Sequence, residues 1–135
     1  VLERVQTAKR QALIQEYIAE SAGRDRRLIV VGNRCVAAME RVAMDGEFRA
    51  NLHRGGSAVA VQPDRQTEQL AVAAAKAHGL AVAGVDMLLG KEGPLLLEVN
   101  SSPGLEGIEN ATGMQIAESI VSFLEKSTRG RKRVD

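Results

Sequence analysis

Three oxygen-bearing side chains in one stretch of this sequence have the spacing of a site for a hard metal ion. They lie in the segment VAGVDMLLGKEGPLLLEVN, where Asp86 belongs to the first of two apolar runs, Glu98 belongs to the second, and Asn100 directly follows the second. Two carboxylates and an amide offer only oxygen ligands, which suit Mg²⁺ or Mn²⁺. The spacing therefore indicates a metal site, with a solvated acidic edge as the alternative interpretation.

The two apolar runs are rich in valine and leucine and are bounded by glycine and proline, which is typical of a β-hairpin. If Gly90 pairs with Pro94 around a three-residue loop, Asp86 lies directly opposite Glu98. Asn100 then shares their face, because residues two apart along a strand point the same way. A four-residue loop would turn Asp86 to the other face. Facing carboxylates repel, so this register also predicts a positive group between them.

The elements that must position these residues follow from apolar periodicity and turn signals. Apolar runs predict strands, and Pro63-Asp64 followed by helical spacing predicts a helix that Gly79 ends in a left-handed conformation. The order of the elements predicts an α+β fold with a largely antiparallel sheet and flanking helices. The expected strands are 12–18, 27–31, 34–42, 58–61, 80–89 and 94–99, the helices 65–78 and 112–126, and the loops 20–26, 43–56 and 101–107.

Composition places the chain among ordinary globular proteins. It has 135 residues, of which 44% are hydrophobic and 26% charged, and a net charge of +1, which suits one domain. One tyrosine and two phenylalanines provide few stacking platforms for single-stranded nucleic acid. The single cysteine, Cys35, excludes an intramolecular disulfide, and we expect a cytoplasmic protein. No signal peptide or run of 18 apolar residues is seen, so we expect no membrane partner.

Other polar clusters could bind a nucleotide, although each has a simpler interpretation. Arg49, Asn51, His53 and Arg54 precede a Gly-Gly pair and could surround a phosphate or a carboxylate. The alternative is a solvated loop in which the glycines only form a turn. The segment 49–56 lacks the Ser-His-Asp order of a hydrolase triad. The whole sequence has neither the lysine loop of a Walker phosphate site nor the Cys/His spacing of a zinc site.

Two further places have the same ambiguity. Asp25 could hydrogen-bond a ribose, or it could form a surface ion pair with its flanking arginines. Backbone groups of Glu16 and Tyr17 could contact an adenine, or they could belong to an ordinary half-buried strand. The basic tail 128–135 is expected to be a solvated end that makes no contact with nucleic acid.

Several of these segments together resemble one enzyme family, the ATP-grasp ligases. They are similar in particular to the RimK-type alpha-L-glutamate ligases, which modify the C-terminus of a small-subunit ribosomal protein. The resemblance runs from about residue 12 to residue 124 and implies the C-terminal half of an ATP-grasp fold. The segments that carry it are IQEYI, GRDRRLIVVGNRCVAAMER, FRANLHRGG, AVAGVDML and LLLEVNSSPGLEGIE.

The resemblance implies roles for individual residues as metal ligands, nucleotide contacts and catalytic groups. The implied ligands of two Mg²⁺ ions, for which Mn²⁺ can substitute, are Asp86, Glu98 and Asn100. The implied ATP contacts are Glu16 and Tyr17 at the adenine, Asp25 at the ribose, and Arg49, Ala50 and Asn51 at the phosphates. The implied catalytic residues are Arg49 and Arg54. Ala50 stands where the family usually has a serine, so we expect only backbone contacts from it.

The resemblance also implies a reaction and its partners. ATP would phosphorylate a carboxylate, and the amine of glutamate would attack the acyl phosphate to form an amide bond. The implied acceptor is the ribosomal protein C-terminus, and the full-length enzyme is expected to be a homo-oligomer. Such ligases carry an N-terminal domain and a lid subdomain with a nucleotide-binding lysine, and neither is seen in this sequence. We therefore expect residues 1–127 to be the C-terminal portion of an ATP-grasp domain, inactive by itself.

Two alternatives remain open at this stage. One is a sister ATP-grasp ligase that acts on a metabolite or on a carrier protein. The other is a non-catalytic binding module.

Overall fold

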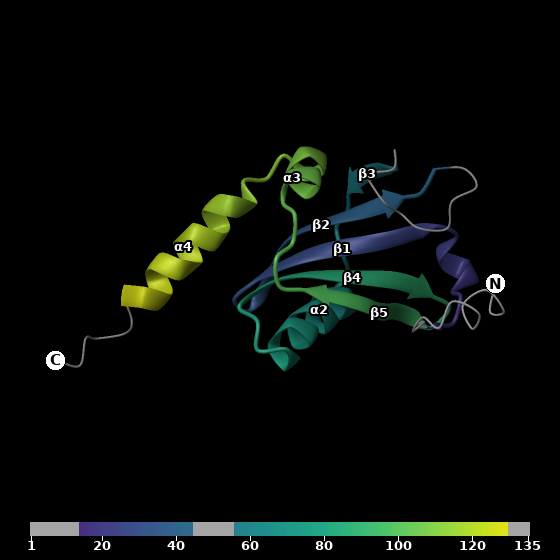
Figure 1. Cartoon of the computed structure of the whole chain (residues 1–135), viewed down its shortest axis with the longest axis horizontal. Coiled ribbons are helices and arrows are strands. Elements are labelled where there is room, and N and C mark those ends of the chain that lie inside the picture. Colours follow the sequence, from purple (N-terminus) through teal and green to yellow (C-terminus); the bar gives the residue numbers. More distant parts are fainter. Residues whose placement is uncertain (1–13, 45–55, 130–135) are drawn as a thin grey trace, which may run out of the picture.

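The computed structural model describes residues 14–44 and 56–129. Within them, a five-stranded antiparallel sheet lies between helix α2 on one face and helices α3 and α4 on the other (Figure 1). The strand order is β3-β2-β1-β4-β5, which confirms the predicted α+β class. The elements are η1 (Ala19–Ser21), β1 (Arg24–Val31), β2 (Arg34–Val42), β3 (Ser57–Ala60), α2 (Arg65–Ala77), β4 (Val82–Gly90), β5 (Gly93–Asn100), α3 (Glu106–Thr112) and α4 (Ile116–Arg129).

Strand β1 lies in the middle of the sheet and is buried on both faces along its second half. Leu28 and Val30 pack against α2, whereas Ile29 and Val31 pack toward α3 and α4. This two-sided burial explains why the sequence here is continuously apolar rather than alternating. The first half of β1 is charged, and the expected loop 20–26 is therefore wrong at its end, because the charged residues from Arg24 onward are paired with β2.

Helix α2 agrees with the prediction within one residue. Asp64 caps its first turn by accepting a hydrogen bond from the Thr67 N–H at 2.8 Å. Gly79, with φ of +67°, follows the helix in the predicted left-handed conformation. The buried face of α2 consists of small side chains, which allow the helix to lie close to the sheet. They are Thr67, Ala71, Ala74 and Ala75.

The C-terminal part differs from the prediction. Residues 101–105 are irregular as expected, but helix α3 begins at Glu106, inside the predicted irregular segment 101–107, and the last helix, α4, begins at Ile116 instead of residue 112. Gly113, with φ of +69°, ends α3 instead of opening the last helix. The two helices are linked by a side chain, because Glu109 of α3 accepts a hydrogen bond from the Ile116 N–H of α4 at 2.7 Å. Such a cap satisfies a free N–H group at the start of α4.

The predicted strand 12–18 is wrong where the structure describes it. Residues 14–18 form no strand, and Ile14 and Tyr17 are 74% and 66% exposed. The apolar alternation of this segment therefore has no packing partner among the described residues. Helix α4 continues through Arg129, so it includes the start of the basic tail that was predicted from residue 128. None of the helices in the described part of the chain is long and apolar enough to span a membrane.

Candidate functional site

Strands β4 and β5 form the predicted hairpin, and Asp86 lies opposite Glu98 as predicted. Gly84 pairs with Asn100 two residues further along the same ladder. Asp86, Glu98 and Asn100 therefore share the face of the sheet that carries α3 and α4. The structure brings the three predicted metal ligands to one end of one hairpin.

The hairpin reaches this register by a route that differs from the predicted one. Gly90 pairs with Gly93 around a two-residue turn, so the predicted pairing of Gly90 with Pro94 is wrong. A two-residue turn continued without interruption would place Asp86 opposite Leu97. A β-bulge at Leu97 inserts one extra residue into β5 and restores the Asp86–Glu98 pair.

The loop after β5 folds back over β4 at a glycine. A Cβ atom on Gly84 would lie 2.7 Å from Cβ of Pro103, so any side chain there would displace the loop. The Ser102 N–H donates a hydrogen bond to Oδ1 of Asn100 at 2.8 Å, which closes a local turn. These contacts fix the amide of Asn100 at the end of β5.

Asp86 is neutralised within the chain by two arginines. Arg27 of β1 donates to both carboxylate oxygens, with Nε and Nη2 each 2.7 Å away. Arg41 of β2 donates from Nη2 to Oδ2 of Asp86 at 2.8 Å. Guanidinium groups therefore neutralise Asp86, but no ion pair to Glu98 is found among the described residues, so a positive group between the two carboxylates stays a prediction.

Asp25 belongs to the same network. Arg41 donates to its two oxygens from Nε at 2.6 Å and from Nη2 at 2.8 Å, so one guanidinium joins Asp25 to Asp86. The side chain of Asp25 is only 10% exposed, so the interpretation of Asp25 as a surface ion pair is wrong. We call Asp25, Arg27, Arg41 and Asp86 the ion-pair network.

Burial and charge act in opposite directions on this network. Burial raises the pKa of Asp25 above its ordinary value, although the guanidinium of Arg41 opposes the rise. Burial by itself would lower the pKa of Arg41, but the hydrogen bond to Asp25 and the charge of Asp86 outweigh it and raise that pKa. Arg41 is therefore held in its charged form.

The side-chain oxygens of Asp86, Glu98 and Asn100 fit a divalent cation even while the arginines bind Asp86. A carboxylate offers about four lone-pair positions. In Asp86, one hydrogen bond to Oδ1 and two to Oδ2 occupy three of them, which leaves one lone pair on Oδ1. Glu98 is exposed, and the Oδ1 atom of Asn100 keeps a second lone pair beside its bond to Ser102. Among the described residues no three His, Cys, Asp or Glu side chains gather as a metal site, so such a site depends on the amide as its third ligand.

The remaining predicted residues fall into two groups. Glu16 and Tyr17 are described and exposed, in the irregular segment that precedes η1. The phosphate-side residues, with the neighbouring His53, lie outside the described residues, and their roles stay predictions. These residues are Arg49, Ala50, Asn51 and Arg54.

Arg27 and Arg41 were missed as functional residues at the sequence level. The predicted strand began at Arg27, so Asp25 was placed in a loop. With β1 beginning at Arg24, Asp25 and Arg27 share a face by their two-residue spacing. This alternation could have indicated that Asp25 and Arg27 share a face. Their ion-pair partners could not be found in the same way, because Arg41 lies 16 residues from Asp25 and Asp86 lies 59 residues from Arg27.

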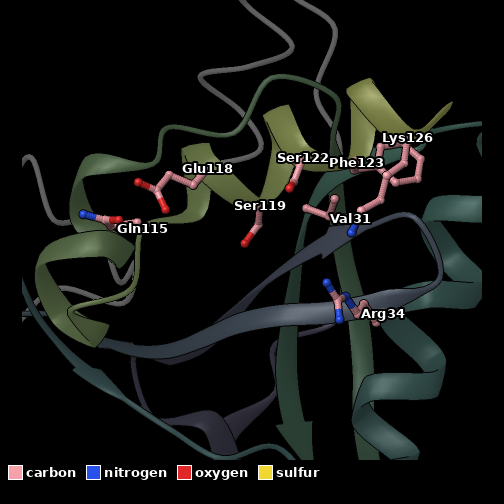
Figure 2. Close-up of a pocket in the computed structure, with 8 residues that line it drawn as sticks. All are labelled: Val31, Arg34, Gln115, Glu118, Ser119, Ser122, Phe123 and Lys126. Atoms are coloured by element: carbon pink, nitrogen blue, oxygen red, sulfur yellow. The ribbon is translucent and has the colours of Figure 1, made fainter. Parts of the chain in front are cut away.

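A separate hollow of about 280 Å³ lies between α4 and the turn that joins β1 to β2. Figure 2 shows Ser119 and Ser122 of α4 pointing into it, with Arg34 on the opposite wall. None of the predicted site residues lines this hollow. It therefore lies apart from the ion-pair network and the hairpin.

Comparison with known proteins identifies close relatives. The chain matches the family described as RimK-like ATP-grasp domain over residues 1–124. It is 54% identical over 129 residues to "Probable alpha-L-glutamate ligase 1" of Shewanella frigidimarina, covering 96% of this chain and 43% of the relative. It is 52% identical over 134 residues to "Probable alpha-L-glutamate ligase" of Nitrosococcus oceani, covering 98% of this chain and 44% of that relative. The chain thus spans less than half the length of these curated relatives.

Solved structures share the fold. The ATP-grasp ligase PsnB, complexed with a phosphomimetic variant of a minimal precursor, Mg and ADP, has a TM-score of 0.67 at 25% identity, over 84% of this chain and 34% of that chain. The macrocyclase MdnC from Microcystis aeruginosa, bound with precursor peptide MdnA, has a TM-score of 0.60 at 16% identity, over 78% and 34%. The second likeness concerns the fold alone.

Proposed function

The chain belongs to the RimK-like ATP-grasp family, and on that premise we propose that it is the metal- and phosphate-binding part of an ATP-dependent glutamate ligase. ATP transfers its terminal phosphoryl group to an acceptor carboxylate, which gives an acyl phosphate and ADP. The amine of glutamate then attacks the acyl carbon, an amide bond forms, and phosphate leaves. The proposed acceptor is the C-terminal carboxylate of a small-subunit ribosomal protein, in a cytoplasmic homo-oligomeric enzyme.

The observation that carries the proposal is the convergence of Asp86, Glu98 and Asn100 beside two guanidinium groups. The three oxygen donors would hold Mg²⁺ or Mn²⁺, which, when bound, neutralises phosphate oxygens. Arg27 and Arg41 keep N–H groups beyond those that bind the two aspartates. These donors would stabilise charge that develops on a transferred phosphoryl group, as preorganised guanidiniums do.

The ion-pair network also keeps these groups in position. Each bidentate arginine–aspartate pair fixes both the distance and the plane of the guanidinium. Because Arg41 binds Asp25 and Asp86 together, the ribose-side acid and the metal-side acid of the proposal would move as one unit. Arg49, Ala50, Asn51 and Arg54 are proposed to complete the phosphate side.

The test is ATP-dependent incorporation of labelled glutamate by the full-length parent. Glu98→Gln removes a metal-binding charge and is expected to lower turnover by at least about 100-fold, as losing a group that stabilises the transition state does. Glu92→Gln, an exposed change in the turn of the same hairpin, is the matched control and should retain activity. Equal activity of Glu98→Gln and the wild type would contradict the proposal.

A second readout is independent of turnover. Mn²⁺ binding to this 135-residue chain can be measured by electron paramagnetic resonance. We expect the wild type and Glu92→Gln to bind Mn²⁺ and Glu98→Gln to bind it much more weakly. We also expect the chain to lack ligase turnover, because it spans less than half of its relatives, and full turnover by it would refute that expectation.

The alternative acceptors are separated by a screen of the parent enzyme with protein C-termini, carrier proteins and small carboxylates. Incorporation into a metabolite or a carrier protein, and not into a ribosomal protein, would reassign the substrate without affecting the metal site. A non-catalytic module would incorporate nothing. The presence of all three donors, Asp86, Glu98 and Asn100, favours the enzyme.

A further inference from the structure

We infer that Ser21 is a positioning residue, which holds the segment bearing Glu16 and Tyr17 against the end of β4 and so sets the affinity for the adenine end of a nucleotide. The inference rests on the proposed function, in which that segment contacts the adenine. Ser21 is the last residue of η1 and is only 5% exposed. Neither the metal donors nor the ion-pair network includes it.

The hydroxyl of Ser21 replaces a missing strand partner of Leu89. Pairing of β1 with β4 extends only as far as Arg26 opposite Met87, so Leu89 has no partner on β1. The Leu89 N–H donates to Oγ of Ser21 at 2.9 Å, and Oγ donates to the Leu89 carbonyl at 3.3 Å. Both backbone groups of a strand residue point to the same side, so β5, where Leu89 pairs with Pro94, offers them no bond. One hydroxyl therefore satisfies both backbone groups of Leu89.

The backbone next to Ser21 shows that this turn is tightly constrained. Ala22 has φ of +47° and is the single non-glycine residue with positive φ in the described part of the chain. An alanine adopts this conformation only where its surroundings impose it. Gly23 continues the left-handed turn with φ of +73°, and β1 begins immediately after it. This turn joins η1, which directly follows residues 14–18, to β1.

Further contacts tie the same turn to the sheet. The Arg24 side chain donates from Nε to the Ser21 carbonyl at 3.3 Å. Glu20 forms an exposed ion pair with Lys91 of the β4–β5 turn, with 3.2 Å between Oε1 and Nζ. An exposed pair of this kind contributes little, so the buried Ser21 hydroxyl is the principal link. The segment before it, residues 14–18, has no regular secondary structure to hold it in place.

The experiment measures binding of MgADP and of magnesium tripolyphosphate to the chain by calorimetry. Tripolyphosphate can occupy phosphate and metal contacts but has no adenine. For Ser21→Ala we expect MgADP affinity to fall about fivefold to tenfold, the equivalent of one or two lost hydrogen bonds, with tripolyphosphate affinity unchanged. Ser122→Ala is the matched control, because Ser122 lines the separate hollow on α4, and it should bind both ligands like the wild type.

Two further measurements guard against a merely structural effect. Amide hydrogen exchange should be faster at Leu89 and at residues 16–18 in Ser21→Ala, and unchanged in β1. Ser21→Cys keeps a weaker donor and acceptor at the same place, so it should show an intermediate loss for MgADP and carries the comparison if the alanine variant does not fold.

The inference is overturned if Ser21→Ala binds MgADP like the wild type, or if it loses MgADP and tripolyphosphate affinity equally. If the wild type binds tripolyphosphate and its affinity for MgADP is no higher, the inference is overturned and the proposed metal site is left intact. A wild type that binds neither ligand would overturn the proposed nucleotide site together with the inference.

Discussion

Replacing Arg41 by methionine tests whether the ion-pair network stabilises the fold that carries the site. Methionine keeps much of the length and volume of the side chain but removes the guanidinium. Three hydrogen bonds are lost, two to Asp25 at 2.6 and 2.8 Å and one to Asp86 at 2.8 Å. Asp86 keeps both bonds to Arg27, whereas Asp25 loses its ion-pair partner among the described residues. The expected effect therefore comes mainly from Asp25.

The magnitude follows from burial. The side chains of Arg41 and Asp25 are 11% and 10% exposed, so the carboxylate is left largely without water or a counter-charge. Removing one partner of a buried pair destabilises by about 3–5 kcal/mol. Because a little solvent reaches Asp25, we expect the free energy of unfolding to fall by about 3 kcal/mol at pH 7, near the lower end of that range.

The loss should depend on pH in a defined direction. Burial already raises the pKa of Asp25, and Arg41 opposes that rise, so the variant should have an even higher pKa in the folded state. The folded protein then binds the proton more tightly than the unfolded chain, whose aspartates titrate near pH 4. The variant should therefore recover stability as the pH falls from neutrality through the raised pKa toward about 4.

Urea unfolding at pH 7 and pH 5 measures both effects. The matched control is Arg26→Met in the neighbouring strand β1, because the side chain of Arg26 makes a single contact of 3.3 Å to Glu40 and is 22% exposed. We expect the control to lose about 1 kcal/mol or less. The reasoning is refuted if Arg41→Met loses no more stability than the control at pH 7, or if its deficit grows as the pH falls.

Three further predictions concern other parts of the chain. Burial raises the pKa of the Cys35 thiol to about 11, so alkylation by iodoacetamide at pH 7.5 should be far slower than that of free cysteine, and a comparable rate would contradict its burial. Gly32→Ala should lower the free energy of unfolding by about 1–2 kcal/mol, because φ is +62° and the new Cβ would lie 2.8 Å from the Phe123 ring; an unchanged urea midpoint would refute this. MgATP should raise the melting temperature of the chain but not that of Asp86→Asn, and an equal shift in both would remove Asp86 from the site.

Local patterns in the sequence were sufficient for some elements and insufficient for others. Helix α2 was predicted within one residue because its cap at Asp64, its apolar spacing and Gly79 all act within a few residues of the helix. The start of α4 was not predicted, because its first N–H groups are capped by Glu109, which belongs to another helix. The strand predicted at 12–18 had suitable alternation but no surface to pack on in the described structure.

The sequence is sufficient to recognise the family and to group the three proposed metal ligands, because Asp86, Glu98 and Asn100 lie within one hairpin whose strands pair with each other. The neutralisation of Asp86, in contrast, depends on the tertiary structure. Arg27 and Arg41 reach Asp86 from two other strands, 59 and 45 residues away, and sequence spacing carries no information about such distant partners. The tertiary structure also decided the register, since the two-residue turn would have misaligned Asp86 and Glu98 without the bulge at Leu97. A one-residue insertion in a strand turns every later side chain to the other face, so the geometry of the site depends on a feature that the hairpin sequence does not reveal.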